Sequence, residues 1–188
     1  KAFHCSMVEL GSCRGLQPDY FISCAWRLKI KDFMLAIEWH AEARQLPDTT
    51  LYFYMMLCCR PSMPGTSKLF PEYFTHRIED SCFLKLIADC VKGVAMVVNS
   101  EDISTRTGWV SLEAYTAIRN FKCLDFVAST GALATTKPFA DLAFEYGDLD
   151  PTISDNFLKF DVQTLHFNAP ENRPFILNAI AYGCFRDS

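Results

Sequence analysis

Solid hydrophobic runs alternate with amphipathic stretches over the first two thirds of the chain. Hydrophobic runs of strand length cover residues 20–26, 51–57, 94–98 and 124–128. Amphipathic stretches, in which apolar side chains recur every three or four positions, cover residues 32–46, 71–90 and 109–121. A short apolar run indicates a buried strand, and the second spacing is typical of a helix with one buried face. The pattern therefore predicts strands that alternate with helices.

Strands without polar alternation are typical of the centre of a parallel sheet, because helices cover both faces of such a sheet. Right-handed crossovers between these strands give a doubly wound arrangement. The expected fold class is α/β, a flavodoxin-like three-layer sandwich with a central parallel sheet. We expect an N-terminal extension at residues 1–19, the α/β core at 20–137 and a C-terminal extension at 138–188.

Individual residues mark where several helices begin and end. Asp32 is expected to cap the first helix, and the second helix is expected to turn Cys82 inward beside Phe83 and Ile87. From residue 130 the pattern loosens into an irregular, partly helical extension. A final helix that packs on the core is predicted at Arg173–Tyr182, after Asn172 as its cap.

Composition narrows the classes of partner. The formal net charge is −4 and the basic residues are scattered, so we expect no binding to nucleic acid. The longest apolar run, residues 51–59, is too short to cross a bilayer, which predicts no membrane span and leaves peripheral association open. The four histidines are isolated and no C-x-x-C pair occurs, so no metal site is expected.

Cysteine usage bears on the compartment. The nine cysteines are an odd number and lie mostly within apolar stretches, as buried free thiols do in a reducing intracellular compartment. The first residue is Lys1, which suggests a processed product or part of a longer polypeptide. The expected location is the cytosol or an organelle, including a plastid if a targeting segment has been removed.

Several stretches of the sequence resemble a known family. Residues 97–100, V-V-N-S, lead through a short loop to W-V-S-L-E at 109–113, and F-I-S at 21–23 precedes Trp26. This arrangement resembles the TIR (Toll/interleukin-1 receptor) domain. The stretches at 22–26, 40–50, 92–99 and 169–180 are also similar to a TIR-like group that is expanded in dinoflagellate algae. The resemblance spans about residues 20–180.

The resemblance implies two kinds of activity. Members of the family associate into signalling or structural assemblies, and some cleave the nicotinamide–ribose bond of NAD with a helix glutamate. Glu113 corresponds to that catalytic acid, and NAD would be a substrate rather than a resident cofactor. The residues expected to line the ligand site are Ser23, Trp26, Arg27, Ser100 and Trp109. The alternative is that Glu113 is a solvated surface acid and that Trp109 packs between helix and sheet.

Three departures from the family pattern favour the interaction module over the enzyme. Val110 stands where the family has cysteine, and Arg27 replaces a glycine of the similar algal sequences. The second strand ends in M-M-L-C-C-R where those relatives are rich in amides, which removes hydrogen-bonding partners for a nucleotide. We therefore expect a non-catalytic TIR-like assembly module, peripheral on a larger complex. The alternatives are an NAD nucleosidase that uses Glu113 and a nucleotide-binding sensor without turnover.

Aromatic residues support this expectation. The chain has sixteen phenylalanines, seven tyrosines and three tryptophans, and part of this set falls in the irregular C-terminal extension. Exposed aromatic clusters anchor protein interfaces. The residues expected to contact a protein partner are Phe139, Phe144, Tyr146, Phe157, Phe160 and Phe167. Asp125 lies inside a strand and is expected to need a hydrogen-bonding partner, and His40 is expected at the surface or between layers.

Overall fold

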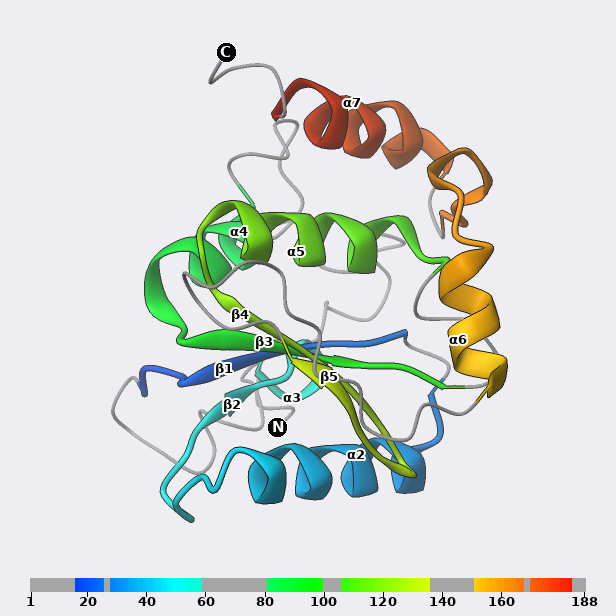
Figure 1. Ribbon diagram of the computed structural model, residues 1–188. Helices are drawn as coiled ribbons and strands as arrows, with labels where there is room; N and C mark the ends of the chain where they lie inside the picture. The colour runs from blue at the N-terminus through cyan, green and yellow to red at the C-terminus, as the bar shows by residue number, and fades with distance from the viewer. Residues whose placement is uncertain are drawn as a thin grey trace, which may run out of the picture.

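The computed structural model describes residues 16–25, 28–58, 81–99, 106–135, 151–167 and 170–183. Five strands form one sheet in the order β2-β1-β3-β4-β5 (Figure 1). Their bounds are β1 Tyr20–Ser23, β2 Tyr52–Phe53, β3 Gly93–Val97, β4 Cys123–Ala128 and β5 Gly131–Thr135. The first four are mutually parallel, and β5 returns antiparallel to β4. The prediction of an α/β fold with a parallel sheet is confirmed for these four strands.

Helices cover both faces of the sheet. Helix α2, Ile30–Ala43, lies on one face, and α4, Cys82–Lys85, lies with α5, Gly108–Arg119, on the other (Figure 1). A π-helical turn, Leu86–Cys90, extends α4. The strand side chains alternate between two buried clusters, so that Ile22 packs toward α2 and Phe21 packs toward α5. This double burial explains why the strands lack polar alternation.

The C-terminal part packs on the outer side of α5 and at the carboxyl end of the sheet (Figure 1). It contains α6, Pro151–Leu158, the short 3-10 turns Val162–Thr164 and Pro170–Asn172, and α7, Arg173–Gly183. A third buried cluster joins Leu112 of α5 to Leu165 and to Ile176 of α7. The final helix begins where the sequence predicted, and it packs on the core through this cluster.

Several expected elements differ from the observed ones. The strand expected at 51–57 has only Tyr52–Phe53, and a helical turn, α3, follows at Met55–Cys58. Strand β2 pairs with β1 at Tyr52 and Phe53. Leucine and methionine accept helical geometry readily, so the chain can form a helical turn where this pairing stops. Residues 71–80 of the second expected helix lie outside the described residues.

Helix positions also required correction. Asp32 lies inside the first turn of α2, and Lys29 is the residue at the cap. Cys82 is exposed, whereas Phe83 and Ile87 are buried as expected. The sequence did not predict strand β5, because G-A-L-A-T has no aromatic residue and only one β-branched residue, Thr135.

Candidate functional site

The carboxyl end of the parallel sheet brings two predicted site residues together. Ser23 ends β1, and Glu113 projects from the face of α5 that carries Val110 and Ala117, both buried against the sheet. Ser23 Oγ donates a hydrogen bond to Glu113 Oε2 at 2.6 Å. The alternative that Glu113 is a solvated surface acid is therefore wrong, because the helix turns this residue toward the strand ends.

Burial changes the proton affinity of this carboxyl group. Withdrawal from solvent raises the pKa of Glu113 to about 7, and the hydrogen bond from Ser23 opposes this shift. Among the described residues no cation pairs with it. Near neutral pH the group is therefore divided between its protonated and ionised forms. Such a carboxyl can donate or accept a proton, which is a property of many functional sites.

Two weakly acidic side chains follow the same strand ends and pack in the other buried cluster, on the face that α2 covers. Cys24 follows Ser23, and burial together with the negative charge of Glu113 raises the pKa of its thiol to about 12. Tyr54 follows β2, and burial raises the pKa of its hydroxyl to about 12. Its ring stacks on Phe33 with ring centres 4.5 Å apart. Both groups stay uncharged at neutral pH, so neither supplies a nucleophilic anion.

An amide oxygen at the same end of the sheet lacks a donor. Asn99 follows β3, and its Oδ1 atom is buried without a hydrogen-bonding partner among the described residues. A buried acceptor left in this state costs about 1–3 kcal/mol. This end of the sheet thus has polar groups that could contact a ligand, and no local pattern in the sequence marks Asn99 as one of them.

Trp109 packs against the C-terminal segment. It packs beside the cluster that contains Leu165 and Ile176, on the outer side of α5. The expectation that Trp109 packs between helix and sheet is therefore wrong, because the C-terminal segment covers the side of the helix on which the tryptophan lies. It contributes to packing between α5 and the C-terminal extension.

The C-terminal segment also covers the beginning of α5. His166 pairs with Thr107 in a parallel bridge, its carbonyl accepts a hydrogen bond from Gly108 N at 3.0 Å, and its own N–H donates to the Arg106 carbonyl at 2.6 Å. The Phe167 ring rests on Gly108, where an added Cβ would lie 2.2 Å from a ring carbon. Glycine is required at position 108 by this close approach.

This contact limits what the helix terminus can bind. The first backbone N–H groups of a helix attract phosphate and other anions. In α5 the N–H of Gly108 is already used by the His166 carbonyl. A phosphate could reach that donor only if the C-terminal segment moved away.

Helix α6 stands at the same end of the sheet (Figure 1). Ile153 of this helix is 3% exposed. It belongs to the buried cluster that contains Val98 after β3, Ala128 at the end of β4 and Val110 in the first turn of α5. Helix α6 therefore contributes a buried side chain at the end of the sheet where open parallel sheets usually hold their ligands.

No protein-family model, curated protein or solved structure matches this chain.

The remaining predicted site residues separate into three groups. Phe160 is 46% exposed and can reach a partner. Phe167 cannot, because its ring is buried against Gly108; its assignment to an external interface is wrong. The candidates whose side chains lie outside the described part are Trp26, Arg27, Ser100, Phe139, Phe144, Tyr146 and Phe157.

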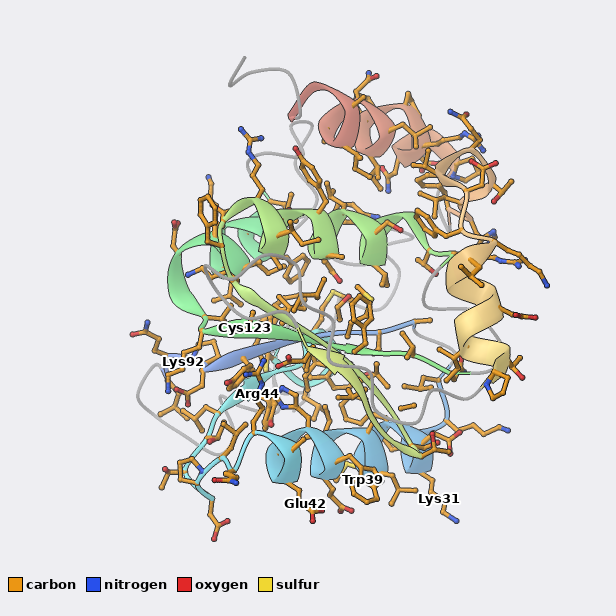
Figure 2. All side chains as sticks on the ribbon, in the orientation of Figure 1. Lys31, Trp39, Glu42, Arg44, Lys92 and Cys123 are labelled. Atoms are coloured by element: carbon orange, nitrogen blue, oxygen red, sulfur yellow. The ribbon has the colours of Figure 1, made fainter. Side chains whose placement is uncertain are left out.

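A second polar cluster lies between α2 and the amino-terminal half of the sheet. Asp125 of β4 accepts hydrogen bonds from Arg44 Nε at 2.9 Å and from Arg44 Nη2 at 2.5 Å. His40 Nε2 lies 3.0 Å from the same carboxylate, and His40 Nδ1 lies 2.7 Å from the Tyr52 hydroxyl. Figure 2 shows Arg44, Lys92 and Cys123 at this end of the molecule. The sequence predicted that Asp125 would need a partner, and this prediction is confirmed.

Charge balance explains why this cluster is stable. The hydrogen bond from Arg44 to Asp125 raises the pKa of the guanidinium group, so this cation persists beside the buried carboxylate. The Tyr20 ring meets the His40 ring edge-on, with centres 4.8 Å apart, and closes the cluster. Asp125 thus accepts hydrogen bonds from the Arg44 guanidinium group and lies within hydrogen-bond distance of His40 Nε2, which indicates a structural role. Among the described residues no group of three His, Cys, Asp or Glu side chains could hold a metal ion.

Proposed function

We propose that this chain is a TIR-like α/β module that acts by binding other proteins, as a peripheral subunit of a larger complex, and that it does not catalyse NAD cleavage. The strand order β2-β1-β3-β4-β5 is that of flavodoxin-like sheets, and the W-V-S-L-E stretch falls on the helix after the third strand, as in the resemblance to TIR domains. The antiparallel β5 is a departure from that pattern.

The observation that carries the proposal is the docking of the C-terminal segment on α5. The His166 carbonyl uses the N–H of Gly108, and Phe167 covers the backbone there. Ile153 of α6 is buried in the cluster that includes Val98 after β3 and Ala128 at the end of β4. The pyrophosphate of a dinucleotide could bind the first N–H group of α5 only if the C-terminal segment moved away, which argues against a dinucleotide beside Glu113.

Exposed apolar side chains of the C-terminal extension support a role in protein binding. Phe160 is 46% exposed, Leu158 is 82% exposed and Phe175 is 53% exposed. Large apolar side chains at a surface are typical anchors of protein interfaces. No helix within the described residues is long and apolar enough to span a membrane.

Incubation of the purified chain with NAD tests the absence of catalysis. We expect nicotinamide release at the rate of buffer alone, and the Glu113→Ala variant should give the same trace by chromatography. Release by the wild-type chain that disappears in Glu113→Ala would overturn this part of the proposal.

Isolation of the tagged chain from its native cells tests the binding function. Phe160→Asp should lose the partner complex on a native gel, because a charge replaces an exposed anchor. Glu113→Ala should keep the complex and is the matched control. If Phe160→Asp retains the full complex, Phe160 is not part of the interface.

The second candidate, Glu113-dependent cleavage of NAD, is favoured by one observation. A carboxyl group with a pKa of about 7, aligned by Ser23, could orient ribose hydroxyls and stabilise the positive charge that develops when nicotinamide leaves. The same groups could bind a nucleotide without turnover. Both activities require the edge to be open.

A further inference from the structure

We propose that the outer face of helix α2 binds the same face of a second copy of this chain, with the two helices antiparallel. This face lies on the side of the sheet opposite to α5 and α7 (Figure 1). It is therefore separate from the C-terminal surface to which we assign a protein partner. The self-association concerns the purified chain alone and does not depend on that partner.

Burial fixes which side of α2 faces outward. The buried residues of the helix are Phe33, Ala36 and His40. A helix turns by about 100° per residue, so the direction opposite to these residues passes between Met34 and Leu35. Figure 2 shows Lys31 and Glu42 projecting from α2 on the side away from the sheet. The outer face is thus defined by the residues on this side of the helix.

The outer face carries opposite charges at its two ends. Lys31 lies in the first turn, and Glu38 follows two turns later within about 20° of the same line along the helix. Both side chains are exposed, and within the described part of the chain neither belongs to an ion pair. Glu42, exposed one turn further on, adds negative charge to its end. The helix dipole has the same polarity, positive at the amino end and negative at the carboxyl end.

The middle of the face is apolar. Met34 is 50% exposed, and Leu35 is partly exposed. Ile30 is 69% exposed and Trp39 is 41% exposed, and these two flank the face on opposite sides. Apolar side chains surrounded by charged ones are typical of surfaces that bind proteins.

This order of side chains is complementary to itself. In a two-fold pair of antiparallel helices centred between Met34 and Leu35, each residue lies opposite the one at the same distance beyond the centre. Lys31 of one copy then lies opposite Glu38 of the other, and the symmetric contact repeats this at the other end. The apolar middle of one copy covers that of the other. An anionic membrane fits less well, because Glu38 and Glu42 would be repelled by it.

The size of the contact predicts a weak dimer. A helix of 14 residues is about 21 Å long, and one face of it buries less than the roughly 1,200 Å² typical of stable complexes. Salt should weaken the dimer further, because it screens exposed charges. The dimer would present two copies of the C-terminal surface, which strengthens binding to a partner that has two matching sites.

Sedimentation velocity of the purified full chain, from about 10 µM to about 1 mM, tests the pairing. We expect a dimer whose affinity falls about tenfold between about 0.05 M and about 0.5 M salt. Lys31→Glu should weaken it about tenfold, because two-fold symmetry turns both contacts into repulsion, and Glu38→Lys should do the same. The double variant Lys31→Glu/Glu38→Lys should recover the wild-type affinity to within about threefold, because the two charges are exchanged.

The matched controls are Lys159→Glu and Glu171→Lys, because both residues are exposed and lie in the C-terminal part of the chain. Each should change the affinity by less than about twofold. Circular dichroism checks that all variants stay folded, which is expected of substitutions at exposed positions. A chain that stays monomeric up to about 1 mM would overturn the proposal, and is the result expected if the face binds a different protein. A double variant as weak as the single variants would also overturn it.

Discussion

The two ends of the sheet bury a carboxyl group in different ways. At the amino-terminal end, Asp125 meets the fixed positive charge of Arg44 and a nitrogen of His40. At the carboxyl-terminal end, Glu113 meets the neutral hydroxyl of Ser23. One buried acid is therefore compensated by charge, and the other by a single dipole within the described residues.

This difference separates a structural site from a candidate functional one. A cation beside a buried acid favours its ionised form, whereas burial without a cation favours the protonated form. The first arrangement fixes α2 against β4. The second leaves a proton that can be gained or lost near neutral pH, and groups of this kind recur at functional sites.

The substitution Asp125→Asn should produce the largest loss of stability, because it removes the carboxylate that Arg44 and His40 contact. The substitution leaves the partly buried Arg44 charge next to a neutral amide at the buried position 125. The free energy of unfolding should fall by about 4 kcal/mol. Urea unfolding followed by circular dichroism measures this change. Asp155→Asn is the matched control, because Asp155 and Lys159 form an exposed pair whose loss should change stability by less than about 0.5 kcal/mol.

The substitution Glu113→Gln tests how the ionisation of Glu113 makes the stability of the chain depend on pH. The pKa of Glu113 is raised from 4.5 when unfolded to about 7 when folded, so the folded state binds more protons between these values. The contribution of Glu113 to the free energy of unfolding should therefore be complete below about pH 4.5. It should fall by about 3 kcal/mol as the pH rises through 7. Glu113→Gln should remove this loss and should be more stable than wild type at pH 8.

Unfolding midpoints in urea between pH 4 and pH 8 measure the effect. The control is Glu42→Gln, because Glu42 is exposed on the outer side of α2 (Figure 2). That variant should follow the wild-type profile. A Glu113→Gln profile parallel to wild type would mean that Glu113 ionises in the folded chain as it does in the unfolded one.

Short sequence patterns predicted the strands and the final helix, because these elements depend on residues that are close together in the chain. The apolar runs predicted parallel strands because two-sided burial excludes polar residues from them. The final helix was placed correctly because Asn172, Pro174 and Gly183 mark its two ends. Glu113 was selected by resemblance, and the structure places it on α5, where it accepts a hydrogen bond from Ser23.

Contacts between distant segments could not be predicted from such patterns. Arg44 and Asp125 are 81 positions apart, and neither residue carries a local sign of the other. The bridge between His166 and Thr107 and the burial of Ile153 with Val98 also join segments that are distant in sequence. A lone glycine such as Gly108 signals close approach, but only the structure identifies the Phe167 ring as its neighbour.

The smallest expected change in stability concerns the amino-terminal end of the sheet, where α5 ends just before β4. Lys122 N donates to the Ala117 carbonyl and Phe121 N donates to the Ile118 carbonyl, which is a Schellman ending with Phe121 in the left-handed position at φ 54°. Glycine takes this conformation without the clash of a Cβ atom, and the Phe121 ring is 69% exposed. Phe121→Gly should therefore raise the free energy of unfolding by about 1 kcal/mol in urea unfolding. Phe121→Ala is the matched control, because it removes the ring and keeps the strain; equal stabilities for the two variants would show that the backbone conformation is not strained.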